Sequence, residues 1–277
     1  MNVIKIFIFY FLFTGLIFAD NKTLVFAPLP LKDIKSIHTQ FSPMIRYLQK
    51  KLKTKIKIDY NTSYDEILRK FEKGEIDIAY LGPLPYLSLD ERYPYVKPLV
   101  NFRNKKGAVS YTCSFVSFIS TTNKIKSLQN TKIALTQPLS TCGYLFVNDI
   151  LKNFNTNIEE NKYRYLGRHD KVALSVIRDE FTYGGLKSDI AKEYFHLGLK
   201  EIKQSEEIPN FILVANTKTI KNDVINNIKN SMISIDKDEL ELWHKSLKYG
   251  TKETKDEDYD HLRKLIKSTK IPHESNF

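Results

Sequence analysis

The chain has 277 residues, of which 42% are apolar and 27% charged, so it can bury a core and is not an intrinsically disordered protein. Its formal net charge is +11, but the lysines are spread evenly and no nucleic-acid-binding motif occurs, so we expect no nucleic-acid partner. The positive charge fits either a solvated lysine-rich surface or the attraction of an anionic ligand. Two cysteines are too few for a zinc finger or a disulfide framework, and we expect no metal and no cofactor.

Residues 1–19 have the three-part layout of a secretory signal peptide. Lys5 supplies a positive charge, residues 6–18 form an apolar run, and Ala19 is a small residue at the expected cleavage position. An uncleaved membrane anchor is the alternative, but the run is shorter than the about 20 apolar residues that a spanning helix needs. We therefore expect the mature chain to be exported to the periplasm.

The following part of the chain alternates strand and helix patterns. Short apolar or alternating runs predict strands at residues 23–27, 55–59 and 76–81. A first helix is predicted to begin at Ser42, because serine followed by proline is a typical helix start. A second helix is predicted between a capping box at Ser63 and a stop at Gly74. This order predicts an α/β fold, with a sheet flanked by helices.

A second run of the same alternation follows. Its predicted strands cover residues 114–120, 132–136 and 163–166, and its predicted helices cover residues 144–153 and 170–178. A late strand at residues 211–215 is expected to return to the first sheet. We therefore predict two lobes, residues 20–110 with 206–277 and residues 111–205. A ligand cleft should lie between them, with hinges near residues 110 and 206.

Two segments that follow predicted strands and open helices carry the candidate chemistry. Ser140, Thr141 and Cys142 bring hydroxyls and unpaired backbone N–H groups to a helix N-terminus, which suits a tetrahedral oxyanion. The alternative is that Ser140 or Thr141 only caps the helix. His169 and Asp170 open the other helix, either as an exposed capping pair or with His169 as a donor to an anion, its imidazole charged at low pH.

Four motifs in a fixed order give the chain a family resemblance. Residues 74–83 read Gly-Glu-Ile-Asp-Ile-Ala-Tyr-Leu-Gly-Pro, and Ser-Thr-Cys-Gly at 140–143, Gly-Arg-His-Asp at 167–170 and Ile-Pro at 208–209 follow. From about residue 24 to residue 266 the chain resembles the phosphate, phosphite and phosphonate substrate-binding proteins of ABC importers. The resemblance implies a type-2 periplasmic binding fold, in which two lobes close on a ligand.

The resemblance also implies which residues bind the ligand. In the family a Ser-Thr-Ser turn, a histidine and tyrosines from both lobes hold the anion. Ser140, Thr141 and His169 match directly, and Tyr64 matches the first-lobe tyrosine. The second tyrosine position falls on Tyr111 or on Cys113, depending on the alignment, and Cys142 replaces the second serine of the turn.

Two acids that hold the substrate amine in aminophosphonate binders match less well. Asp189 lies twenty residues after His169, where the first acid is expected, and should face the variable end of the ligand. Phe211 stands where the second acid would be. The loss of one acid argues against an aminoalkyl substrate.

Cys113 and Cys142 are expected to lie close together at the cleft wall of the second lobe. In an oxidising compartment they would form a disulfide. The alternatives are two unrelated buried thiols, or free thiols in which a Cys142 thiolate holds a thiophilic oxyanion. Asn61, in the triplet Asn-Thr-Ser, is a candidate glycan acceptor.

The favoured hypothesis is a monomeric, non-enzymatic binding protein that delivers a small oxyanion or polar solute to an ABC permease. A second hypothesis is a ligand-binding partner of a membrane sensor kinase. A third is a hydrolase that uses Ser140, His169 and Asp170, although spacing alone does not assemble these residues into a catalytic set.

Overall fold

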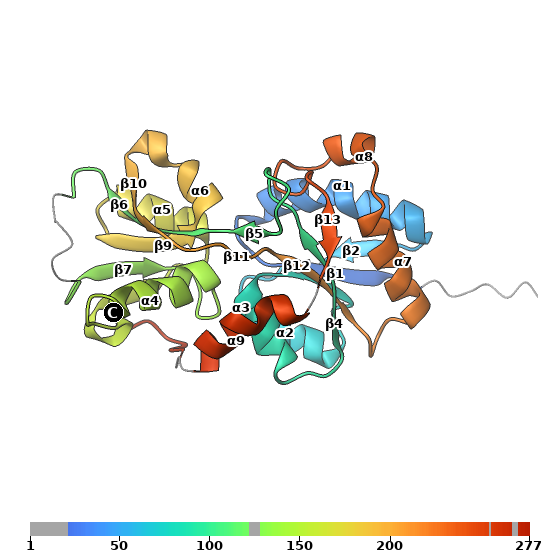
Figure 1. Cartoon of the computed structure of the whole chain (residues 1–277), viewed down its shortest axis with the longest axis horizontal. Helices are drawn as coiled ribbons and strands as arrows, with labels where there is room; N and C mark the ends of the chain where they lie inside the picture. Colours follow the sequence, from blue (N-terminus) through green and yellow to red (C-terminus); the bar gives the residue numbers. More distant parts are fainter. Residues whose placement is uncertain (1–21, 122–127, 255, 268–270) are drawn as a thin grey trace, which may run out of the picture.

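The computed structural model describes residues 22–121, 128–254, 256–267 and 271–277. The expected signal peptide, residues 1–19, lies outside them. The described chain forms two α/β lobes that are joined by a short pair of strands (Figure 1). None of the described helices is both long enough and apolar enough to cross a membrane.

The first lobe is built on a six-stranded mixed sheet with the strand order β13-β4-β12-β3-β1-β2. Its strands are β1 (Leu24–Pro28), β2 (Ile56–Ile58), β3 (Ile78–Leu81), β4 (Val96–Phe102), β12 (Ile212–Asn216) and β13 (Thr251–Glu253). Strands β2, β1 and β3 pair in parallel, whereas β12 enters antiparallel between β3 and β4. The predicted return of the late strand to the first sheet is thus confirmed.

Helices flank this sheet, and the start of one of them matters for the site. The helices are α1 (Ile34–Leu52), α2 (Tyr64–Lys73), α3 (Pro83–Asp90), α7 (Asn222–Ile233), α8 (Lys237–Glu241), a 3-10 turn (Asp256–Tyr259) and α9 (Asp260–Lys267). The Ser63 hydroxyl accepts a hydrogen bond from the Glu66 N–H and fixes the start of α2. Gly74 ends this helix at a φ of 78°, in the left-handed region that favours glycine. The cap therefore determines where Tyr64, the first residue of α2, lies.

The second lobe has a five-stranded sheet with the order β10-β6-β9-β7-β8. Its strands are β6 (Cys113–Phe118), β7 (Lys132–Leu135), β8 (Lys162–Tyr165), β9 (Tyr183–Lys187) and β10 (Leu199–Gln204). Its helices are a π-helical turn η1 (Thr141–Leu145), α4 (Phe146–Lys152), η2 (Ile158–Glu160), α5 (His169–Ile177), α6 (Ser188–Lys192) and η3 (Phe195–Leu197). Helices α4 and α5 both pack against β9.

Two short strands connect the lobes. Strands β5 (Ser110–Tyr111) and β11 (Ile208–Pro209) pair antiparallel, with Ile208 opposite Tyr111. Figure 1 shows both of them running between the two sheets. They lie where the sequence places the hinges, near residues 110 and 206.

In the first lobe, the structure differs from the sequence analysis at two places. Helix α1 begins directly after Asp33, because the Asp33 carboxylate accepts a hydrogen bond from the Ser36 N–H and caps the helix there. Pro43 lies inside α1 and not at its first turn. Asn61 is not an accessible glycan acceptor, because it is 2% exposed and its side-chain nitrogen donates to Asp59.

Direct hydrogen bonds hold the two lobes against each other. Gln137 of the second lobe accepts a hydrogen bond from the Tyr64 N–H at 2.7 Å and donates one to the Thr62 carbonyl at 3.3 Å. At the start of α3, the Leu84 N–H donates to the Thr141 hydroxyl at 3.1 Å. The structure is therefore a closed form, in which the first turns of α2 and α3 face the second lobe.

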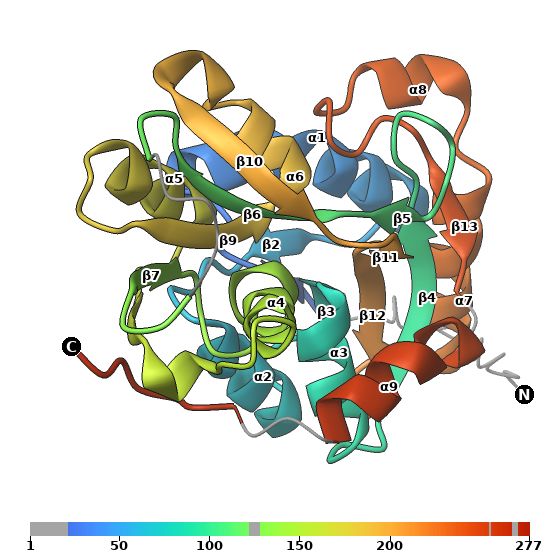
Figure 2. The same cartoon turned by 60° about the vertical axis from the view of Figure 1, so that its left-hand side comes forward.

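The C-terminal tail, residues 271–277, lies along the outer strand β8 of the second lobe. Asn276 donates its N–H to the Tyr163 carbonyl and accepts the Tyr163 N–H on its side-chain oxygen. The Tyr165 N–H donates to the Ser275 hydroxyl. Figure 2 shows the C-terminus beside the second lobe, far from α9. This segment, which the sequence assigned to the first lobe, thus packs on the second.

Candidate functional site

A cavity with an empty volume of about 250 Å³ lies between the lobes. Its lining residues are Leu29, Tyr64, Gly82, Pro85, Tyr111, Ser140, Thr141, Cys142, His169, Lys187 and Phe211. This volume includes open solvent at the mouth of the cavity, so the enclosed space is smaller still and suits only a small solute. All residues that the sequence proposed for the ligand site are among the lining residues, apart from Cys113 and Asp189.

The Ser140–Thr141 turn forms one wall of the cavity and also starts η1. The Ser140 hydroxyl accepts a hydrogen bond from the Gly143 N–H at 3.0 Å, so Ser140 is a helix cap as well as a lining residue. A Cβ atom on Gly143 would lie 1.8 Å from the Thr136 hydroxyl oxygen. Only glycine therefore lets η1 approach β7 this closely, and this approach sets the position of the turn.

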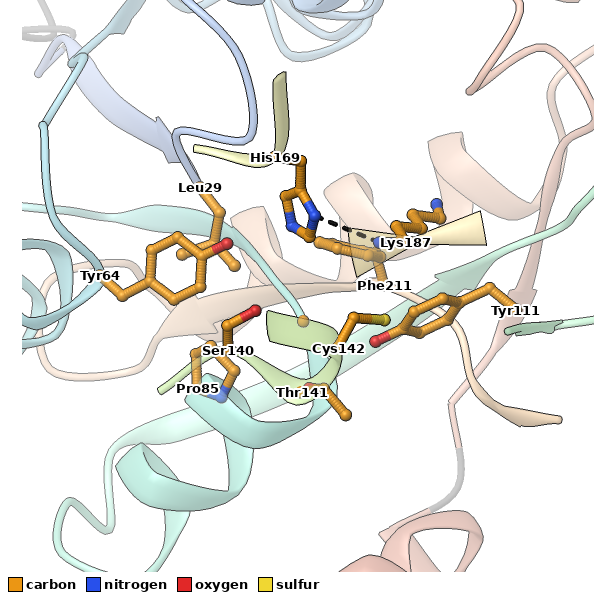
Figure 3. A pocket seen from close by; sticks show the side chains of 11 residues that line it. Leu29, Tyr64, Pro85, Tyr111, Ser140, Thr141, Cys142, His169, Lys187 and Phe211 are labelled. Atoms are coloured by element: carbon orange, nitrogen blue, oxygen red, sulfur yellow. Dashed lines mark hydrogen bonds between the residues drawn. The ribbon is translucent and has the colours of Figure 1, made fainter. Parts of the chain in front are cut away.

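Tyrosine hydroxyls from two different parts of the chain meet the hydroxyls of the turn. The Tyr64 hydroxyl lies near the hydroxyl of Ser140, and the Tyr111 hydroxyl lies near that of Thr141. Burial raises the pKa of both phenols well above the ordinary value, so both keep their protons at neutral pH. Figure 3 shows the hydroxyls of Tyr64, Ser140 and Tyr111 turned toward one space. The result is a group of neutral O–H donors that converge from both lobes.

His169 adds a nitrogen donor from the start of α5. Its Nδ1 accepts a hydrogen bond from the Lys187 N–H at 3.1 Å, drawn as the dashed line in Figure 3. Burial, and then the nearby charges of Lys187 and Lys32, lower the pKa of His169 to about 3. The ring is therefore neutral and carries its proton on Nε2. The expectation that a charged His169 imidazole assists at low pH is wrong.

The two cysteines form a disulfide, with a distance of 5.0 Å between their Cα atoms. Cys113 begins β6 and Cys142 lies in η1, so the bond ties the turn to the sheet. Of the alternatives left open by the sequence, those with free thiols are therefore overturned. A Cys142 thiolate that holds a thiophilic oxyanion is excluded with them, because both sulfurs are used in the disulfide.

Asp189 does not lie where the sequence analysis expects it, and Lys187, which the sequence analysis does not name, lines the cavity. Asp189 is exposed in the first turn of α6 and is not a lining residue. Lys187, the last residue of β9, lines the cavity instead. The available signal was a charged residue at the carboxyl end of an apolar strand, where ligands of α/β sheets are bound.

The ammonium group of Lys187 lies over two aromatic rings. Its ammonium lies 4.8 Å from the ring centre of Phe211 and 5.1 Å from that of Tyr111. Phe211 is fixed in turn by stacking on Tyr80, with 4.9 Å between ring centres. Desolvation lowers the pKa of the Lys187 ammonium, and the charge of Asp189 opposes this shift.

Gln137 is a second residue that the sequence analysis missed. It is 5% exposed and lies between β7 and the Ser140 turn. Besides its bonds to the first lobe, its side-chain nitrogen donates to the Gly167 carbonyl at 2.8 Å. Gln137 thus links α2 to the segment before His169, and no local pattern signals such a link.

The charge of the walls makes the cavity suitable for an anion. Among the described residues that line it there is no aspartate or glutamate, whereas Lys187 brings a positive charge. The described part of the chain contains no cluster of His, Cys, Asp and Glu side chains that could hold a metal ion. The lining residues offer O–H and N–H groups as donors to an anion.

Comparisons with known proteins identify the family and the fold of the chain. A family model described as "ABC transporter, phosphonate, periplasmic substrate-binding protein" matches residues 26–269. The chain is 21% identical over 219 residues to the phosphate-import protein PhnD of Mycolicibacterium smegmatis, and the match covers 70% of this chain and 66% of that protein, just under two thirds of its length.

Two solved structures have a similar fold. PhnD1 from Prochlorococcus marinus in complex with methylphosphonate has a TM-score of 0.78 at 16% identity, covering 90% of this chain and 98% of that one. A binding protein component of an ABC phosphonate transporter from Pseudomonas aeruginosa has a TM-score of 0.77 at 16% identity, covering 89% and 86%. The two-lobed fold of this chain is thus the type-2 periplasmic binding fold.

Proposed function

Because the chain belongs to the family of periplasmic substrate-binding proteins of phosphonate ABC transporters, we propose that its cavity captures a small phosphonate- or phosphate-type anion for an importer. The observation that carries this proposal is the convergence of Tyr64, Tyr111, Ser140, Thr141 and His169 on a cavity whose described walls contain no carboxylate. A tetrahedral oxyanion accepts several hydrogen bonds at once, and neutral donors with fixed geometry suit it.

The energetics are compatible with tight binding. Each hydrogen bond to a charged group contributes about 1.5–3 kcal/mol, and micromolar affinity requires about 8 kcal/mol. Four or five such bonds supply about 6–15 kcal/mol, and the upper part of this range also covers the ordering of ligand and lobes. The neighbouring hydroxyls of Tyr64 and Ser140, and of Tyr111 and Thr141, would each donate a proton to the ligand.

The protein should bind its ligand without chemical turnover. A hydrolytic set of Ser140, His169 and Asp170 is not assembled, because His169 Nδ1 faces the Lys187 N–H while Asp170 pairs with Arg168 at 3.0 Å. A thermal-shift screen with phosphate, phosphite, methylphosphonate and sulfate tests the proposal. A ligand at 100 times its Kd adds about 2.7 kcal/mol of stability. Stabilisation by none of the phosphorus anions would contradict it, and so would hydrolysis of phosphate esters at this site.

Export and assembly complete the proposal. Cleavage after Ala19 would release a mature chain that begins at Asp20, and mass spectrometry of the exported protein measures that terminus. We expect this chain to be a monomer that docks on an ABC permease. Family membership favours such a permease over a membrane sensor kinase.

A further inference from the structure

The ammonium of Lys187 has no acidic partner at short range. Among the described residues it takes part in no ion pair and donates no hydrogen bond, although the backbone N–H of Lys187 bonds His169. Asp189, the nearest acid along the chain, is exposed on α6. The faces of the Tyr111 and Phe211 rings thus hold the ammonium in place without neutralising its positive charge.

The residue at position 211 keeps this charge available. Phe211 is 4% exposed, lines the cavity and lies under the ammonium of Lys187. A carboxylate at this position would form an ion pair with Lys187 and cancel its charge. An aromatic ring holds the ammonium in place and leaves its field to act on whatever occupies the cavity.

We infer that Lys187 determines the ligand class, so that the cavity admits phosphonates and phosphates without a cationic substituent and excludes aminoalkylphosphonates. This inference rests on the proposed function. The phosphoryl group meets the converging hydroxyls and His169, and any substituent shares the remaining small space with the wall that carries Lys187. An ammonium there meets a like charge, and the described walls offer no carboxylate to hold it.

Titration calorimetry with methylphosphonate and 2-aminoethylphosphonate tests the inference. We expect the wild-type protein to bind methylphosphonate about 100-fold or more tightly than 2-aminoethylphosphonate, because like charges in a desolvated site repel strongly. Lys187→Met should weaken the binding of methylphosphonate about tenfold and reduce this ratio. The variant removes one positive charge that attracts the phosphonate group and repels the ammonium group of 2-aminoethylphosphonate. Lys187→Glu should shift the preference further toward 2-aminoethylphosphonate, and Lys187→Arg should keep the wild-type ratio.

Lys200→Met is the matched control. Lys200 is exposed on β10 of the same lobe, so the variant removes one positive charge from the lobe but none from the cavity, and its ratio should equal that of the wild type. Equal wild-type affinities for the two ligands would overturn the inference, even if every Lys187 variant failed to fold. An unchanged ratio in folded Lys187→Met would overturn it too. Failure of the wild type to bind either ligand or phosphate would instead contradict the proposed function.

Discussion

At the scale of single residues, the site depends on side chains that keep their protons. The phenols of Tyr64 and Tyr111 are buried and have raised pKa values, so they remain donors. His169 is buried and has a lowered pKa, so it remains neutral while Nε2 keeps a proton. Each group is held in one protonation state across the neutral range, and the donor pattern does not change with modest changes of pH.

The pKa of His169 makes a prediction about folding stability. An unfolded histidine takes up a proton below about pH 6.5, whereas the folded one stays neutral down to about pH 3. The wild-type protein should therefore lose about 1.4 kcal/mol per pH unit through this group as the pH falls through that window. His169→Gln should lose less stability between pH 7 and pH 5 than the wild type, by about 2 kcal/mol. Urea unfolding at both pH values measures this difference, and parallel losses would show that His169 titrates normally.

At the scale of elements, the site is assembled from the starts of helices that face each other across the cleft. Tyr64 begins α2, His169 begins α5 and Ser140 caps η1. Gln137 bridges two of these starts, because its side chain bonds the Tyr64 N–H and the Gly167 carbonyl. Gln137 thus contributes to the closure of the lobes, together with the bond from Leu84 to Thr141, and holds the start of α2 against the second lobe.

Gln137→Ala should shift the lobes toward an open form. The variant loses the hydrogen bonds to Tyr64 and Thr62, each with a net value of about 0.5–1.5 kcal/mol. We expect the affinity for methylphosphonate and for phosphate to fall by the same factor, about tenfold, because both ligands require the same closure of the lobes. Gln129→Ala, at an exposed position, is the control. A loss for one ligand only would indicate that Gln137 contacts the ligand directly.

The helices and strands were largely predictable from the sequence, but the contacts between them were not. The cap at Ser63 and the stop at Gly74 are local signals, and the structure has both. The start of α1 was missed because Ser42 and Pro43 resemble a helix start, whereas Asp33 caps the helix earlier. Lys187 and Gln137 act through contacts with distant segments, which no local periodicity contains.

At the scale of the whole molecule, the chain crosses between the lobes at β5 and β11, and its last residues return to the second lobe. The tail covers the outer edge of β8, where unpaired backbone groups would otherwise face solvent. Phe277 packs on Phe181 with 5.6 Å between ring centres. The tail therefore stabilises the second lobe, although none of its residues lines the cavity.

Deletion of residues 271–277 should destabilise the protein and spare its site. The loss of the bonds from Ser275 and Asn276 to β8 should lower the free energy of unfolding by about 2 kcal/mol. Below the unfolding transition, the Kd for methylphosphonate should stay within about twofold of the wild type, because none of the deleted residues lines the cavity. Unfolding curves and calorimetry on the truncated protein measure the two quantities. A large loss of affinity would show that the tail controls closure.

The most direct test of the central claim is calorimetric titration of methylphosphonate into the wild type and the double variant Ser140→Ala with Thr141→Ala. The claim is that the hydroxyls of this turn hold the anion together with His169 and the two tyrosines. Two charge-assisted hydrogen bonds are lost in the variant, so we expect binding to weaken by about 3 kcal/mol, or about 100-fold. A folded double variant that binds methylphosphonate as tightly as the wild type would contradict the account.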